Sequence, residues 1–175
     1  MLYTRKGDLG TTKTFGCDQR ISKSSAVAEA LGSLDEINSL LGLLKVKTDP
    51  ETAKILATAQ QNLFTIQAEV AGADKRIGEE KVKEAETIID NIEKELPPIK
   101  TFFVSGGTEM AALCDFARTI ARRAERRVVG VVDEGKVMVS PQALSYLNRL
   151  SSLLYALARL SNHKSGITEE PPSYK

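Results

Sequence analysis

Apolar residues recur at spacings of three and four over most of the chain after residue 20, which places them on one face of a helix. Interruptions of this pattern divide the chain into five predicted helices. The first carries Val27 to Leu44, the second begins at Asp49-Pro50 and runs to Ala71, the third covers Glu79 to Leu96, the fourth begins at a cap formed by Thr108 or Ser105 and ends near Val132, and the last follows Ser140-Pro141. The positions expected to form the core are Val27, Leu31, Leu34, Ile37, Leu41, Leu44, Ile55, Leu56, Leu63, Ile66, Val70, Ala71, Val82, Ile88, Ile89, Ile92, Leu113, Phe116, Ala117, Ile120, Ala121, Ala124, Val128, Leu144, Leu147, Leu150, Leu154 and Leu157.

The connections between the predicted helices are short and contain residues that end helices or form turns. Pro97-Pro98 ends the third helix because proline cannot donate a backbone hydrogen bond, and Asp133-Glu134-Gly135 is typical of a turn. Five helices joined in this way predict an all-α, up-and-down bundle in a single domain over residues 1–175. We find no strand pattern of useful length and no internal repeat. Residues 1–20 are expected to form an ordered or partly ordered loop, and residues 166–175 a flexible tail.

The charge balance narrows the range of expected partners. The chain has 24 Lys and Arg residues against 23 Asp and Glu residues, a net charge of +1. No overall field therefore favours nucleic acid or an anionic membrane, and any anion site must come from local clustering. Neither a signal-peptide pattern nor an apolar run long enough to cross a bilayer is present, so we expect a cytoplasmic protein.

Cysteine and histidine are scarce, which limits the metal chemistry expected of the side chains. Cys17 and Cys114 are the only cysteines and do not make a disulfide framework, so we expect reduced thiols. The single histidine, His163, is expected at the surface near the end of the last helix. Glu-x-x-His pairs for a di-metal site and a His/Cys set for zinc are both missing from the sequence. A metal that takes part would come with a substrate or be held by phosphates.

Glycine, threonine and basic residues are concentrated between Thr4 and Thr12, in the string TRKGDLGTT. Glycines let backbone amides converge on an anion, hydroxyl groups add donors, and Arg5 and Lys6 add positive charge. The segment is not a Walker A loop because it lacks Gly-Lys-Ser/Thr at the required spacing. An inert, turn-rich N-terminus is the alternative that composition alone leaves open.

The predicted fourth helix places Arg118, Arg122 and Glu125 on one face, at i, i+4 and i+7. Two guanidinium groups one turn apart repel each other unless an anion or carboxylate lies between them, and Arg is well suited to phosphate. Asp35 lies beside the apolar face of the first helix, where Arg118 would be a natural partner. The alternative for both groups is a solvated charged surface. The arginines that fit this alternative are Arg123, Arg126 and Arg127.

Polar residues of the last helix and two phenylalanines are further candidates. Asn148, Ser152 and Tyr155 share one helix face, where amide and hydroxyl groups could hydrogen-bond a nucleotide, although most polar residues on helix surfaces have no special role. Phe102 and Phe103 lie in the Gly-rich approach to the fourth helix, where aromatic side chains most often fill a core.

Five motifs taken together give the chain a family resemblance. They are TRKGDLGTT, ISK followed by VAEALGSLDEINSLLG, FFVSGGTE, ARTIARRAER and YLNRLSSLLYALAR. Their order and content resemble the PduO-type corrinoid adenosyltransferases, and they cover most of the chain from Thr4 to Arg159. The resemblance implies a ferritin-like five-helix bundle that assembles as a homotrimer, with ATP bound between neighbouring subunits. It also implies transfer of the 5′-deoxyadenosyl group of ATP to the Co(I) of cobalamin or a related corrinoid, with Mg²⁺ and triphosphate release.

The resemblance assigns roles to particular residues. Those that match ATP-binding positions of the family are Thr4, Arg5, Gly7, Asp8, Gly10, Thr12, Lys23, Arg122, Glu125, Asn148, Arg149 and Ser151. Arg122 and Lys23 are expected to act in catalysis together with Phe102, which matches a corrinoid-facing phenylalanine. Asp35 and Arg118 match an intersubunit ion pair. Mg²⁺ would be held mainly by the ATP phosphates, without a dedicated side-chain site.

Two departures from the family pattern and two other functions complete the expectations. Ser105 stands where the family often has Pro, and Cys114-Asp115 where it commonly has Leu-His.

A flavoprotein reductase and an adenosylcobalamin-dependent enzyme are the expected protein partners. A nucleotide-binding regulator without chemistry would bind ATP but form no cobalt–carbon bond. A purely structural helical oligomer would not bind ATP at all.

Overall fold

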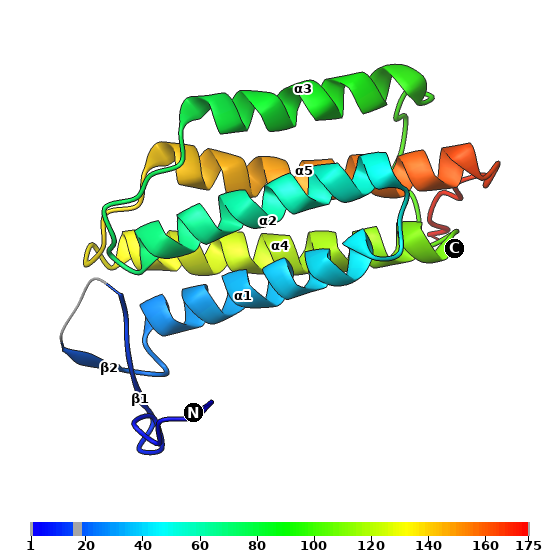
Figure 1. The fold of residues 1–175 in the computed structure, drawn as a ribbon. Coiled ribbons are helices and arrows are strands. Elements are labelled where there is room, and N and C mark those ends of the chain that lie inside the picture. Colours follow the sequence, from blue (N-terminus) through cyan, green and yellow to red (C-terminus); the bar gives the residue numbers. More distant parts are fainter. Residues whose placement is uncertain (1, 16–18, 175) are drawn as a thin grey trace.

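The computed structural model describes residues 2–15 and 19–174, and its five helices confirm the predicted number. Cys17 lies outside these residues. The elements in chain order are β1 (Thr11–Lys13), β2 (Arg20–Ser22), α1 (Ala26–Lys45), α2 (Pro50–Val70), α3 (Glu79–Glu95), α4 (Glu109–Asp133) and α5 (Pro141–Lys164) (Figure 1).

Three helices begin at the residues that the sequence predicts. The Asp49 side chain accepts hydrogen bonds from the amides of Glu51 and Thr52, which otherwise have no partner in the first turn. Thr108, rather than Ser105, caps α4, and Ser140 caps α5, each through its side-chain oxygen. Pro50 and Pro141 stand in the first turn, where the missing amide proton costs nothing.

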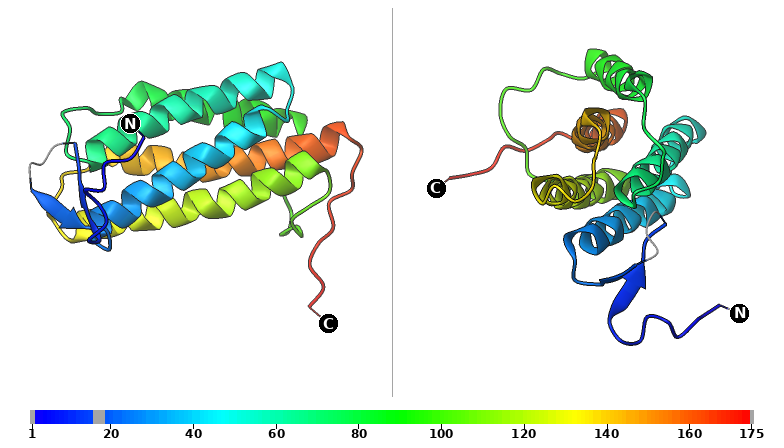
Figure 2. Two further views of the ribbon diagram at one scale, coloured as in Figure 1. Left: turned by 60° about the horizontal axis from the view of Figure 1, so that its bottom comes forward. Right: turned by 90° about the vertical axis from the view of Figure 1, so that its left-hand side faces the viewer.

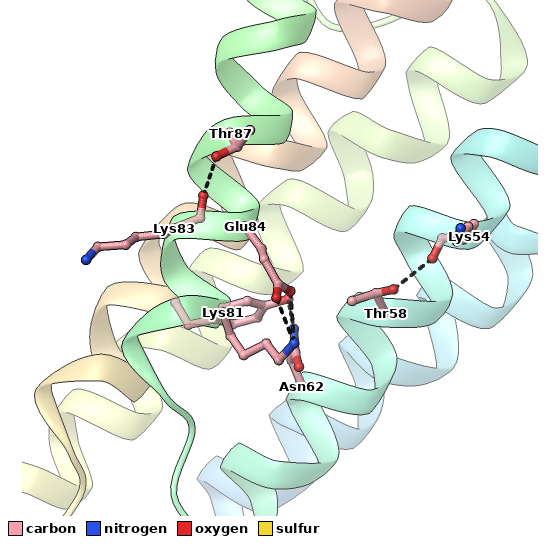
Figure 3. A network of polar contacts seen from close by, with 8 residues as sticks. Lys54, Thr58, Asn62, Lys81, Lys83, Glu84 and Thr87 are labelled. Carbon is pink, nitrogen blue, oxygen red and sulfur yellow. Dashed lines mark hydrogen bonds and ion pairs between the residues drawn. The ribbon is translucent and has the colours of Figure 1, made fainter.

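The helices lie roughly along one direction, with α4 packed against both α1 and α5, and α2 packed on α1. Helix α3 lies on the outside of the bundle and packs mainly on α5 (Figure 2). In the region between α2 and α3, polar side chains bond mostly within their own helix, as in the Thr58–Lys54, Thr87–Lys83 and Lys81–Glu84 contacts (Figure 3). Helix α3 therefore depends on α5 for its position.

Most of the predicted core is buried, and one prediction is wrong. Leu34, Ile37 and Leu147 are fully buried, whereas Phe116 is 57% exposed. Phe116 precedes the buried Ala117 and follows the buried Asp115 on α4, so this stretch of the helix turns its small and polar residues inward and its aromatic ring outward. Hydrophobicity alone does not reveal such an inversion. His163 is exposed near the end of α5, as expected.

The N-terminal segment contains an antiparallel pair of strands, which corrects the expectation of a loop without strands over residues 1–20. Thr12 of β1 faces Ile21 of β2. Each strand has three residues, too few to produce a recognisable alternating pattern. Together with the preceding loop, this hairpin projects beyond the beginning of α1 (Figures 1 and 2).

The tail after α5 contacts the loop before α4 and the α5 residue Arg159. The amide of Val104 donates to the carbonyl of Glu170 at 2.9 Å, and the Arg159 Nε atom donates to a Glu169 carboxylate oxygen at 2.9 Å. The tail thus lies against the loop that precedes α4. Within residues 2–15 and 19–174, none of the helices combines the length and apolar character needed to cross a bilayer.

Candidate functional site

The loop before α4 and one face each of α4 and α5 enclose a cavity of about 590 Å³, which we call the arginine cavity. Among its lining residues are Phe102, Phe103, Asp115, Arg118, Arg122, Ser151, Ser152, Tyr155 and Arg159. The structure therefore brings together two predicted groups, the arginines of the fourth helix and the polar face of the last helix. It adds the two phenylalanines as a wall.

The two predicted arginines of α4 have different surroundings. Arg118 donates from Nε to Asp115 Oδ1 at 3.2 Å, and its guanidinium lies 5.9 Å from the centre of the Tyr155 ring. Burial raises the pKa of Tyr155, whose hydroxyl therefore stays protonated at neutral pH. Arg122 is exposed, and within the described residues its guanidinium makes no ion pair or hydrogen bond. Of these two arginines, Arg118 is thus neutralised by a carboxylate, and Arg122 is available to an anion.

The other arginines of α4 confirm the expectation of a solvated basic face. Two of them form ion pairs with acidic residues of another helix. Arg123 forms an ion pair with Glu36, and Arg127 lies 3.8 Å from Glu29. Both acidic residues belong to α1, so these arginines tie α4 to α1. They leave Arg122 as the arginine of this cluster that faces the cavity without a partner in the described part of the chain.

Glu125, Asn148 and Arg149 form a hydrogen-bonded chain next to the arginine cavity. The Asn148 Nδ2 atom donates to Glu125 Oε1 at 3.0 Å. Arg149 donates from Nη1 to Asn148 Oδ1 at 2.7 Å and from Nε to Glu86 Oε1 at 2.7 Å. Arg149 thus points toward α3. Ser151 is buried and donates to the backbone carbonyl of Asn148.

Arg159 is a site residue that sequence reasoning missed. It is 4% exposed, pairs with Glu169 of the tail, donates to the carbonyl of Pro97 at 3.1 Å, and lies 5.3 Å from the Phe103 ring centre. One buried cation therefore connects the tail with the beginning and the middle of the loop that carries Phe102, which is 80% exposed. The only signal in the sequence was a charged residue within the apolar stretch of the last helix.

The N-terminal segment is organised by Arg20, a second residue that the sequence did not single out. Its guanidinium donates to the side chain and carbonyl of Thr11 at 2.8 and 2.7 Å, and to the carbonyl of Lys6. Gly10 adopts φ +75°, which favours glycine, and its carbonyl accepts from the amide of Lys23 at 2.9 Å. The Lys23 ammonium lies beside Gly7, since a Cβ there would be 3.1 Å from Nζ.

This N-terminal head, residues 2–15 with 19–25, does not line the arginine cavity of its own chain. Thr4, Arg5, Gly7, Asp8, Gly10 and Thr12 all lie in it, together with Lys23. The structure thus divides the predicted ATP-binding residues into two groups at different places in one chain. Within the described residues, Asp8 is the only carboxylate of the head, and no group of three or more metal-ligating side chains is found.

Asp35 and Arg118 do not meet within the chain. Asp35 is exposed and lines a second cavity of about 660 Å³ between α1 and α2, together with Phe15 and Phe64. Arg118 lies in the arginine cavity and has Asp115 as its partner. An ion pair between Asp35 and Arg118 would therefore have to join two copies of the chain.

Comparison with known proteins identifies the family. The family model described as Cobalamin adenosyltransferase matches residues 2–161. The corrinoid adenosyltransferase PduO of Citrobacter freundii is 39% identical in an alignment 170 positions long that covers 93% of this chain and 50% of the relative. The corrinoid adenosyltransferase of Bacillus subtilis strain 168 is 39% identical in an alignment 176 positions long that covers 95% of this chain and 89% of the relative. The chain spans about half the length of the Citrobacter PduO protein.

Solved structures share the whole fold. A variant of the PduO-type ATP:corrinoid adenosyltransferase from Lactobacillus reuteri, complexed with cobalamin and ATP, superposes with a TM-score of 0.92 at 30% identity and covers 99% of this chain and 97% of that chain. Another variant of this enzyme, complexed with ATP, has a TM-score of 0.89 at 30% identity and covers 98% of this chain and 100% of that chain.

Proposed function

The chain belongs to the cobalamin adenosyltransferase family, and we propose that it transfers the 5′-deoxyadenosyl group of ATP to the cobalt of a reduced corrinoid. The observation that carries this proposal is the arginine cavity. It combines an unpaired arginine, hydrogen-bonding groups of α5 and an exposed phenylalanine wall in one space of about 590 Å³. The curated relatives and the Lactobacillus reuteri complexes support the choice of ATP and corrinoid as its substrates.

The proposed reaction needs no protein nucleophile. Co(I) of the corrinoid attacks the 5′-carbon of ATP with its electron pair, a cobalt–carbon bond forms, and the carbon–oxygen bond breaks so that triphosphate leaves with that bond's electrons. The protein must then align the two substrates and stabilise the growing negative charge on the leaving group. Arg122 suits this task because its guanidinium is not already neutralised by a carboxylate.

Phe102 would supply the apolar side of the reaction. Reduction of Co(II) to Co(I) is difficult while an axial ligand remains on cobalt. A hydrophobic wall that excludes the lower ligand would ease it, and the Phe102 side chain is exposed on the loop that borders the cavity. Arg159 and Glu169 would keep this loop in place through Pro97 and Phe103. A reductase that delivers the electron and an enzyme that uses the adenosylated product are the expected partners.

We further propose a homotrimer in which the head of one subunit completes the arginine cavity of a neighbour. The head offers backbone amides, Arg5 and Lys23 to a triphosphate, but none of its described residues lines the arginine cavity of its own chain. Mg²⁺, if bound there, would lie chiefly on phosphate oxygens, with Asp8 as the available carboxylate, and would neutralise phosphate charge. Asp35 and Arg118 would then pair across the interface, with Asp115 as a second carboxylate on Arg118.

The decisive experiment is anaerobic incubation of the protein with ATP, Mg²⁺ and chemically reduced cobalamin. We expect the spectrum of an alkylated corrinoid to develop and one triphosphate to be released for each cobalt–carbon bond formed. ATP binding without this product would indicate a nucleotide-binding regulator and would refute the enzyme assignment. Absence of ATP binding would favour a structural oligomer.

A further inference from the structure

The outer helix α3 reaches the predicted nucleotide-binding residues through one ion pair. Glu86 of α3 accepts from Arg149 Nε at 2.7 Å, and both side chains are about two-fifths exposed, at 41% and 38%. The same guanidinium donates from Nη1 to Asn148 Oδ1 at 2.7 Å. Because the guanidinium is planar and its donors are fixed relative to each other, holding Nε on Glu86 also sets the direction of Nη1.

This arrangement determines which way the Asn148 amide faces. Its oxygen accepts from Arg149, and its nitrogen donates to Glu125 Oε1 at 3.0 Å. The flipped amide would place the NH₂ group against a guanidinium and the oxygen against a carboxylate, so both neighbours disfavour it. The donor and acceptor atoms of Asn148 and Glu125 therefore have defined directions before any ligand binds. Glu86 contributes to this order because it holds the Arg149 guanidinium.

Arg149 itself is directed away from the arginine cavity. It lines a separate cavity of about 240 Å³ between α3 and α5, together with Glu86 and Gln142, and it is not among the lining residues of the arginine cavity. Because its guanidinium is already bonded to Glu86 and Asn148, Arg149 is suited to holding Asn148 in place.

We propose that Glu86 is a positioning residue for nucleotide binding, acting through Arg149 to orient the amide of Asn148 toward Glu125. This inference rests on the proposed function, since it takes Asn148 and Glu125 as groups that contact ATP. It gives α3 a role in the site, although no residue of that helix lines the arginine cavity.

The test compares Glu86→Ala with Glu84→Gln in the full chain. Glu84 is a suitable control because it lies on the same helix, pairs with Lys81 at 2.9 Å (Figure 3) and has similar exposure. Within the described residues it bonds to neither Arg149 nor Asn148. Calorimetry with ATP and Mg²⁺ should show an increase of about fivefold in the dissociation constant for Glu86→Ala, in the range of couplings between contacting residues. Glu84→Gln should leave that constant within experimental error of the wild type.

A double-mutant cycle separates positioning from general loosening of α3. In an Arg149→Met background, Glu86→Ala should cause no further increase in the dissociation constant for ATP, because its route of action is already removed. In ligand-free protein labelled at asparagine, the Asn148 side-chain amide signals should shift in Glu86→Ala but not in Glu84→Gln. A full effect of Glu86→Ala in the Arg149→Met background would overturn the proposal, as would equal effects of the two α3 variants or unmoved Asn148 signals.

The outcomes distinguish this inference from the proposed function. If the wild-type protein binds ATP but forms no cobalt–carbon bond, the enzyme assignment falls, and the calorimetric comparison still decides the role of Glu86. If the wild-type protein does not bind ATP, both proposals are overturned. Normal turnover by the wild type with unchanged ATP binding in Glu86→Ala overturns the positioning role alone.

Discussion

Arg122 lies on the exposed side of α4, and its charge has no carboxylate partner in the described part of the chain. If it stabilises the departing triphosphate, Arg122→Ala should lower kcat by about 10²- to 10³-fold, as removal of a transition-state donor does. Anaerobic turnover measures the loss, and far-ultraviolet circular dichroism checks that the helices still form. Arg126→Ala is the matched control, because Arg126 is exposed on the same helix and, among the described residues, bonds only to the Arg122 carbonyl. Turnover of Arg122→Ala at the wild-type rate would contradict this role.

Phe102 is an apolar side chain that the bundle leaves 80% exposed beside the arginine cavity. Phe102→Ala should impair corrinoid seating and reduction of Co(II), because the apolar wall is lost, and should leave the Michaelis constant for ATP within about twofold of the wild type. Optical spectra of bound Co(II) corrinoid report the change in axial ligation directly. A rise confined to the Michaelis constant for ATP would show that the ring serves the nucleotide instead.

Cys114 is a buried thiol for which burial raises the pKa to about 12. The thiolate is the reactive species, so Cys114 should not react with thiol reagents in the folded protein at pH 8. In a Cys17→Ser variant, where Cys114 is the sole thiol, labelling should follow urea unfolding and should be negligible without urea. Rapid labelling of the folded variant would show that this part of α4 opens readily.

At the scale of single elements, the Asp49 cap of α2 makes the free energy of unfolding depend on pH in the acid range. The pKa of Asp49 is lowered from 3.8 to about 2, and the largest cause is the hydrogen bond from the Thr52 amide. The folded state therefore holds this proton less tightly than the unfolded state. The resulting stability is present above pH 3.8 and is lost as the pH falls toward 2.

Asp49→Asn tests this contribution, because asparagine caps a helix about as well but does not titrate. The variant should lose less stability than the wild type between pH 5 and pH 2, as measured by urea unfolding at each pH. Asp49→Ala should cost about 1 kcal/mol at pH 7, because the cap itself is removed. Identical pH profiles for Asp49→Asn and the wild type would show that another carboxylate controls this range.

The helices could be predicted because their signals are local. A cap such as Ser140 followed by Pro141 and a repeat such as Leu147, Leu150 and Leu154 are read within a few residues of each other. The hairpin of the N-terminal segment could not be predicted in this way. Its strands are joined by hydrogen bonds of Arg20 to Thr11 and Lys6, which lie nine and fourteen residues earlier in the chain.

At the scale of the whole molecule, the separation of the head from the arginine cavity leads to a prediction about assembly. Asp35→Asn should weaken the proposed trimer, because Arg118 would lose its partner on the neighbouring subunit. We expect the dissociation constant of the oligomer to rise by about tenfold, just below the range of coupling energies of close interfacial charge pairs. Sedimentation at several protein concentrations measures this constant.

Asp90→Asn is the control for Asp35→Asn, since Asp90 is exposed on α3 and its substitution removes the same negative charge. The effect of Asp35→Asn is expected to be moderate because Asp115 still neutralises Arg118 within the subunit. If sedimentation and adenosylation both remain as in the wild type, the pairing of Asp35 with Arg118 is refuted.

The sequence by itself determined the five helices, most of their caps, and the motifs that identify the family, because these features depend on residues close together in the chain. Only the tertiary structure decided which distant side chains meet. It turned Phe116 to the surface, Arg149 toward Glu86 and Arg159 toward Glu169. It also kept the described residues of the head out of the arginine cavity of their own chain. Helical periodicity specifies a buried face, but which partner a polar side chain finds depends on how the helices pack.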